Sequence, residues 1–286
     1  MAVDGQGRLG VVAYAFEPRR RPALRRALQS LAAVAPWPAG SRLVLVRRAG
    51  QPALGDPGIG LPVLELADDG LRWEFGAWQR GIDALRGPGE PDAWLLLNDT
   101  AGVNDPWPVA ERQALRRAAD AMAATDAVVL AGAVKPAPQA CALAGQPLPA
   151  WVQSQACALS AAALGALDGR VFDADLFSAP QVSQGRLAWP PAVSAALAAH
   201  IGGWLTRPGK DGWRHHSGRA EVADALLRDK AGAILLEKRL AATVLAAGGT
   251  LQDCSPPEPG ALQLLARRLF YWQRRLGQSL PHRRVA

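Results

Sequence analysis

The sequence has 286 residues, of which 49% are hydrophobic and 20% charged, so the chain can bury one large core and is not disordered throughout. Its formal net charge is +7, and the excess comes from arginine. That excess fits either the base composition of a GC-rich genome or attraction to phosphate groups on a substrate or lipid surface.

The three cysteines, Cys141, Cys157 and Cys254, are scattered without metal-ligand spacing, which fits a reducing cytoplasm. The first residues resemble no signal peptide, and the longest apolar runs, such as 127–134, are too short to cross a bilayer. Few aromatic residues alternate with basic ones outside the tail. We therefore expect a cytoplasmic protein with no membrane-spanning segment and no nucleic-acid partner.

The first half of the chain alternates apolar runs typical of buried strands with amphipathic runs typical of helices. Strands are predicted at 11–16, 42–47, 61–66, 93–97 and 126–134. Helices are predicted from Pro22, over 73–85 and over 109–124. This order predicts an α/β fold with a mostly parallel sheet and helices on both faces.

The second half, about 136–259, is less regular. It contains a predicted strand at 150–159, an aromatic loop over 202–217 and a long helix over 230–247 that ends at Gly248. The tail, 260–286, begins with an amphipathic helix whose leucine stripe lies opposite arginines. Such a helix suits either packing on the domain or peripheral contact with an anionic membrane at its inner, cytoplasmic face.

Polar side chains follow several of the predicted strands. Phe16 ends the first strand, Asp69 follows the third, and Asn98, Asp99 and Thr100 follow the fourth. Ligands of such sheets bind beyond the carboxyl ends of the strands, so a site is predicted there. Asp99 could hold Mg²⁺ or Mn²⁺, and Asn98 could orient it or bond a ribose hydroxyl, although Asn-Asp is also common in plain turns.

Two glutamates have both a functional and a plain interpretation. Glu74 lies in the first turn of a helix, where it either favours the helix dipole or approaches a ligand. Glu237, expected at the start of its helix, is either a general base or a solvated or salt-bridged surface residue. Gln153 and Ser154 point to opposite faces of their predicted strand, so at most one of them lines a site.

Four segments occur in an order typical of one family: 69–78, 95–100 with Gly102 after it, 151–154, and 236–240 in a helix that ends at Gly248. Over roughly 11–249, this pattern resembles the rhamnan-synthesis-type glycosyltransferases of polysaccharide and O-antigen assembly. In that family a turn and an Asp-Phe-Gly-like helix start precede a Leu-Asn-Asp strand end, a Gln-Ser strand and a Glu-led helix.

The resemblance implies a GT-A-like glycosyltransferase domain over 1–259, with a nucleotide-sugar half over about 1–135 and an acceptor half after it. Its partners would be a nucleotide-sugar donor and a glycan or lipid-linked acceptor. It implies Asp99 at the diphosphate or a divalent cation, and Glu237 with Asp99 as catalytic residues. The implied substrate contacts are Phe16, Asp69, Glu74, Phe75, Asn98, Asp99, Thr100, Gln153 and Ser154.

Three residues depart from the family pattern. Asp69 stands where asparagine is more usual, Glu74 where aspartate is, and Thr100 where a second acid or serine often follows, which leaves metal dependence open. A non-catalytic relative that acts within a membrane polysaccharide complex is therefore the alternative. A Rossmann-type oxidoreductase is disfavoured, because residues 16–21 contain no glycine where its Gly-x-Gly-x-x-Gly turn would lie.

Overall fold

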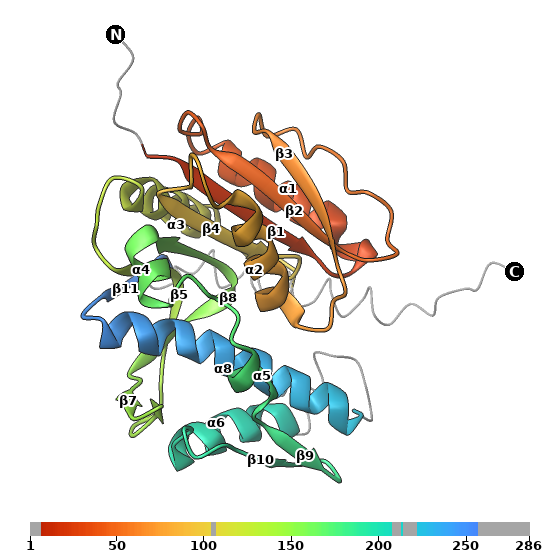
Figure 1. Ribbon diagram of the computed structural model, residues 1–286, viewed down its shortest axis with the longest axis vertical. Helices are drawn as coiled ribbons and strands as arrows, with labels where there is room; N and C mark the ends of the chain where they lie inside the picture. The colour runs from red at the N-terminus through yellow and green to blue at the C-terminus, as the bar shows by residue number, and fades with distance from the viewer. Residues whose placement is uncertain (1–6, 104–106, 208–212, 214–221, 257–286) are drawn as a thin grey trace, which may run out of the picture.

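A computed structural model describes residues 7–103, 107–207, 213 and 222–256 of the chain, which build on one seven-stranded sheet (Figure 1). The strand order is β3-β2-β1-β4-β8-β5-β11, and every pairing is parallel except those of β8 with β4 and β5. The strands are β1 (Leu9–Ala15), β2 (Arg42–Arg48), β3 (Val63–Asp68), β4 (Ala93–Asn98), β5 (Val129–Pro136), β8 (Ala150–Ser160) and β11 (Thr250–Asp253).

Helices cover both faces of this sheet, and two separate apolar clusters fill the space beneath them. Leucines of α1 (Arg21–Ala32) and α3 (Val109–Met122) pack on one face with the odd-numbered residues of β1 and β4. The even-numbered residues pack on the other face against α2 (Trp73–Leu85), α4 (Ala161–Ala166) and α8 (Asp224–Ala246). The fold class is therefore the predicted one: a Rossmann-type α/β fold with a mostly parallel sheet and helices on both faces.

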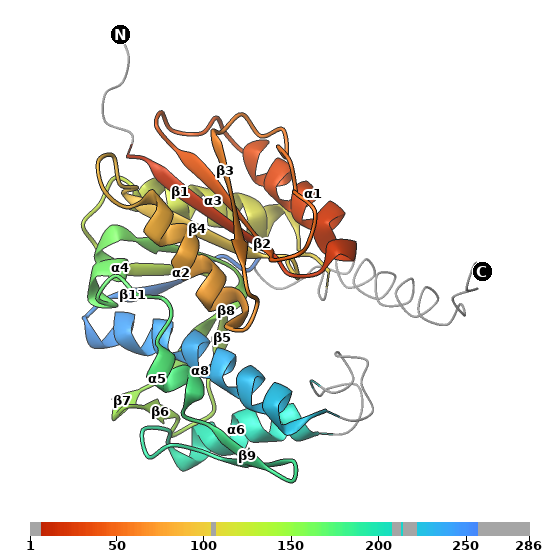
Figure 2. The ribbon, with the colours of Figure 1, turned by 45° about the vertical axis from the view of Figure 1, so that its right-hand side comes forward.

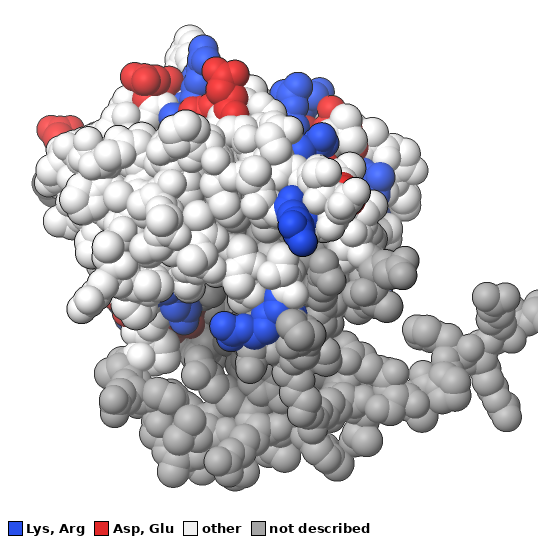
Figure 3. Space-filling model, turned by 90° about the horizontal axis from the view of Figure 1, so that it is seen from below, with Lys and Arg blue, Asp and Glu red and all other residues white. Residues whose placement is uncertain are grey.

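A smaller layer lies on the far side of α8 from the sheet (Figures 1 and 2). Figure 3 views the molecule from the side of this layer, where most of the described surface is uncharged. The part of the chain that the structure describes contains no helix that is both long and apolar enough to cross a membrane. The layer contains α5 (Ala174–Ser178), α6 (Ala195–Thr206) and the hairpins of β6 (Ala142–Leu143) with β7 (Gln146–Pro147) and β9 (Gln181–Ser183) with β10 (Arg186–Ala188).

Two predictions for the second half are wrong in part. The loop expected from residue 202 begins later, because Ser194 caps α6 and Ile201 and Leu205 bury their side chains from its last turns. The long helix begins at Asp224, six residues before its predicted start at 230, and buries Leu227 and Ala231. The tail at 260–286 lies outside the described residues, and the boundaries at 135 and 259 stay predictions.

An irregularity in β8 shapes the edge of the sheet where the strand ends meet. Between the pairs Gly132–Cys157 and Val134–Val152, one residue of β5 faces four residues of β8, 153–156. The extra residues crowd the backbone of β5, since a Cβ on Gly132 would lie 2.5 Å from a methyl group of Val152. The absence of a side chain at Gly132 thus leaves room for the bulge in β8 that contains Ser154.

Candidate functional site

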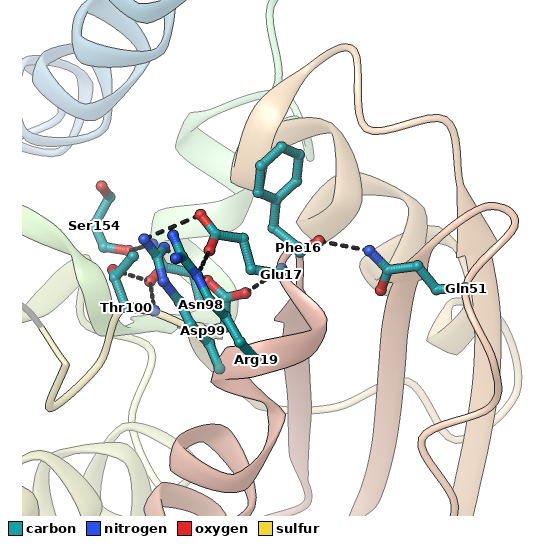
Figure 4. A network of polar contacts seen from close by, with 9 residues as sticks. Phe16, Glu17, Arg19, Gln51, Asn98, Asp99, Thr100 and Ser154 are labelled. Carbon is teal, nitrogen blue, oxygen red and sulfur yellow. Dashed lines mark hydrogen bonds and ion pairs between the residues drawn. The ribbon is translucent and has the colours of Figure 1, made fainter. Parts of the chain in front are cut away.

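The carboxyl ends of β1, β3 and β4 meet at one edge of the sheet, and the first residues of antiparallel β8 run past the end of β4. Side chains alternate along a strand, so the neighbours Asn98 and Asp99 point in opposite directions. Asp99 contacts the connection between β1 and α1, and Asn98 contacts β8 (Figure 4). The end of β4 therefore divides this edge into two sides.

On the first side, Asp99 is anchored to the β1–α1 connection, which contains the short helix η1 (Pro18–Arg20). The Asp99 carboxylate is only 2% exposed, accepts the Glu17 backbone N–H at 2.6 Å, and pairs with the Arg20 guanidinium at 3.5 Å. Glu17 itself binds the side chains of Arg19 and Arg20 (Figure 4). Burial raises the pKa of Asp99, against the opposing effect of its backbone hydrogen bonds and Arg20.

On the second side, hydrogen bonds connect three elements of the fold through Ser154 of β8. The Asn98 amide donates to the Ser154 carbonyl at 3.0 Å, which fixes the end of β4 against β8. The Ser154 hydroxyl donates to Glu74 of α2 at 2.9 Å, and its backbone N–H donates to Glu237 of α8 at 2.8 Å. Two carboxylates, buried at Glu74 and mostly buried at Glu237, are therefore held on one serine by helices far apart in sequence.

Glu237 lies in the middle of α8, so its predicted place at the start of a helix is wrong. Its other carboxylate oxygen accepts from Lys238 Nζ at 2.5 Å, and that ammonium lies 3.5 Å from the ring centre of Trp151. Burial alone would raise the pKa of Glu237, but Lys238 and the Ser154 bonds outweigh it and lower that pKa. Glu237 is therefore an ionised carboxylate at neutral pH despite its burial.

Aromatic and basic side chains form a column beside these acids. The rings of Phe16 and Trp73 stack with 6.2 Å between centres and 10° between planes. Arg48 lies over the outer face of this pair at Phe16, and Lys230 of α8 lies over Trp73. Trp73 has a φ of 53°, a left-handed conformation that is strained for an aromatic residue at the start of a helix.

Some predicted residues take no direct part in this grouping. Phe75 is fully buried against Trp78 in the core. Asp69 is exposed and accepts the Leu71 N–H, so it closes the turn before α2. Thr100 donates its backbone N–H to the Asn98 side chain at 2.9 Å and supports that side chain. Gln153 is half-buried on β8 beside Ser154.

Several residues of the site were not among the predicted site residues, and Tyr14, Arg20, Asp68 and Lys238 are the most informative of them. Asp68, not Asp69, is the buried acid of that turn, and its place two residues after Leu66, which packs on the core from β3, could have shown it. Tyr14 is the second-last residue of β1 and pairs with Asn98, and the alternation from Val12 along β1 could have shown that it faces the same side. No sequence pattern marks Arg20 or Lys238 as site residues. Arg20 acts through its contact with Asp99, which is distant in sequence, and Lys238 acts through its neighbour Glu237 within a helix.

The cation predicted at Asp99 has no complete set of ligands among the described residues. Among residues 7–103, 107–207, 213 and 222–256, no group of three or more histidine, cysteine, aspartate or glutamate side chains is placed to hold a metal ion. One Asp99 oxygen is bonded to Glu17 and the other is paired with Arg20. Asp105, the nearest further acid in the sequence, lies outside the described residues.

Comparisons with known proteins are sparse. No family model matches the chain, and no curated protein matches it by sequence. Among solved structures, it is similar to a mannosyltransferase, PcManGT from Pyrobaculum calidifontis, in complex with GDP-mannose and Mn²⁺. The identity is 14% and the TM-score 0.41, over 97% of this chain and 82% of that one.

Proposed function

We propose that this chain is a glycosyltransferase that moves a sugar from a nucleotide-sugar donor to a hydroxyl of a glycan or lipid-linked acceptor in bacterial surface polysaccharide synthesis. One observation carries the proposal. Basic groups and a buried acid lie on one side of the end of β4, and a mostly buried, ionised glutamate lies on the other. Transfer from a nucleotide sugar needs both a place for diphosphate and a base for the acceptor.

The two sides then have separate tasks in the reaction. Glu237 accepts the proton of the acceptor hydroxyl, whose oxygen forms the new bond to the anomeric carbon. The bond from that carbon to the phosphate oxygen breaks, and the diphosphate leaves with the electron pair. Positive charge to stabilise that leaving group would come from Arg20, which is paired with Asp99, and from Arg19, which is paired with Glu17.

A thermal-shift screen tests this proposal. The purified protein is heated with UDP-, GDP-, dTDP- and CMP-sugars, each with and without Mn²⁺. We expect one nucleotide class to raise the melting temperature, and Asp99→Asn to abolish that shift. Asp126→Asn, an exposed aspartate before β5, is the matched control and should keep it. A dependence on Mn²⁺ would support the predicted cation at Asp99, and no shift with any donor would overturn the proposal.

The second candidate is a non-catalytic relative in a polysaccharide assembly complex. The engagement of Asp99 by Glu17 and Arg20, with no metal-holding group in the described part of the chain, favours it. In cells, Glu237→Gln separates the two: lost surface glycan supports the enzyme, and unchanged glycan supports the non-catalytic partner.

Membrane contact through 260–286 is a separate proposal, which rests on the amphipathic, arginine-rich sequence of the tail. It would place a cytoplasmic enzyme at the inner face of the membrane. Removal of the residues after Pro259 should release the protein from vesicles of anionic lipid in a sedimentation assay. If the shortened protein still sediments with them, the tail is not the anchor.

A further inference from the structure

The hydroxyl of Tyr14 is buried at the carboxyl edge of the sheet without a hydrogen-bond partner in the described part of the chain. Tyr14 is only 2% exposed, and it pairs in register with Asn98 of β4 and Val46 of β2. An unpaired buried hydroxyl costs free energy, and most buried polar groups in proteins have a partner.

The surroundings of this hydroxyl are polar and mostly acidic. The carboxylates of Asp68, Glu74 and Asp99 lie near enough to raise the pKa of Tyr14 further after burial has raised it, and Arg48 opposes them. Tyr14 therefore stays a neutral O–H donor at all physiological pH values. Its ring also lies 6.0 Å from that of Phe16, the half-buried end of the aromatic column, so the hydroxyl belongs to the same edge.

We propose that Tyr14 is a ligand-binding residue whose hydroxyl donates to a sugar hydroxyl of the bound substrate. This inference rests on the proposed function and specifies it further. A sugar hydroxyl can accept from Tyr14 and at the same time donate to Asp68 or Glu74, whose carboxylates each keep acceptor capacity beyond their bonds to Gly70 and Ser154. A phosphate would face three carboxylates and one arginine here, whereas Arg19 and Arg20 balance the charge of Glu17 and Asp99 on the other side of the β4 end, so a neutral sugar hydroxyl suits Tyr14 better than a phosphate.

Tyr14→Phe removes only the hydroxyl and keeps the buried ring, so it tests the inference directly. Without ligand, we expect a melting temperature equal to or above that of the wild type, because an unpaired polar atom is lost. With ligand, we expect binding about five- to tenfold weaker, the loss of one neutral hydrogen bond. Ser30→Ala, which removes a hydroxyl on α1 at the opposite face, should not weaken binding.

The probes for calorimetric titration are UDP-glucose, GDP-mannose and dTDP-glucose, the matching nucleoside diphosphates, and free glucose, mannose and ribose. Equal weakening of the nucleotide sugars and the diphosphates places the contact on the ribose. Weakening of the nucleotide sugars alone places it on the transferred sugar. If the wild type binds a free sugar but no nucleotide, and Tyr14→Phe loses that sugar, the inference stands and the proposed function fails.

Three results would overturn the inference. The first is Tyr14→Phe binding every probe as tightly as the wild type. The second is a fall in the melting temperature of ligand-free Tyr14→Phe, which would show that the hydroxyl is satisfied within the fold. The third is a wild-type protein that binds none of the sugar-bearing probes.

Discussion

The two sides of the end of β4 hold their acids in opposite ways. The Asp99 carboxylate is buried and accepts backbone N–H groups, and the effect of burial dominates, so the pKa of this carboxyl is raised. Glu237 is buried as well, but the ammonium of Lys238 and the bonds to Ser154 lower its pKa. Burial alone therefore does not determine the direction of a carboxyl pKa shift at this edge. The charged partner of the carboxylate decides it. That contrast suits an acid beside a leaving diphosphate on one side and a base for an acceptor on the other.

The largest expected effect is on the Glu237 side. Glu237→Gln keeps the shape and one oxygen for the bond from Ser154, but it removes the proton acceptor and the ion pair with Lys238, so sugar transfer should fall by about 10²- to 10⁴-fold. Initial rates with the donor identified by the thermal-shift screen measure this effect. Glu90→Gln, an exposed glutamate at the opposite edge, is the control and should keep full activity. A rate for Glu237→Gln within twofold of the wild type would exclude Glu237 as the base.

A smaller effect tests whether Lys238 sets the state of Glu237. Lys238→Met leaves burial as the dominant influence, so the pKa of Glu237 should rise and the acidic limb of the pH–rate profile should move to higher pH. Lys238→Arg should restore much of the wild-type profile, and Lys135→Met on β5 should leave it unchanged. The other charged or titratable groups near Glu237 and Lys238 are Glu74, Cys141, Cys157, His200 and Lys230.

The same pair has a stability consequence with a definite sign. Because the folded pKa of Glu237 is lowered, its ion pair stabilises the fold above the ordinary pKa of a glutamate, about 4.3. That stabilisation is lost as the pH falls through the lower, folded value. In Lys238→Met this contribution should be absent, so urea unfolding from pH 7 to pH 3 should show a smaller loss of stability from this site than in the wild type. An identical pH dependence in the two proteins would contradict the role of Lys238.

The smallest effect concerns the bulge that presents Ser154. Gly132→Ala places a methyl group 2.5 Å from Val152 and 2.9 Å from the Ala156 carbonyl, so it should cost about 1–3 kcal/mol of unfolding free energy. Gly165→Ala in α4 meets no atom within 4 Å and should cost nothing. Urea denaturation measures both. A Gly132→Ala protein as stable as the wild type would show that the bulge yields freely.

The sequence predicted the sheet well and the site only in part, for physical reasons. Strands such as β1 and β4 are continuous apolar runs and α2 carries a clear apolar face, so local pattern determines them. The long helix α8 has apolar residues around much of its surface, because it packs between the sheet and the smaller layer, and its start was therefore misjudged. The hydrogen bond between Ser154 and Glu237 depends on a bulge in β8, and no local sequence pattern predicts that bulge.

The same reasoning explains the choice between neighbouring acids. The family-like motif predicts Asp69 as a substrate contact, while the structure buries Asp68 and leaves Asp69 at the surface. Strand alternation carried to the last residue of β3 separates the two, but only when the end of the strand is known. Arg20 has several arginine neighbours in the sequence, and the sequence does not indicate which of these arginines contacts Asp99.

The most direct test of the account compares donor binding by Asp99→Asn and Glu237→Gln in the same calorimetric titration, with the donor that stabilises the wild type. If the two sides of the β4 end have the proposed tasks, Asp99→Asn loses donor affinity, while Glu237→Gln binds the donor as tightly as the wild type and fails to transfer the sugar. Loss of donor affinity in Glu237→Gln with unchanged affinity in Asp99→Asn would contradict the division of the site.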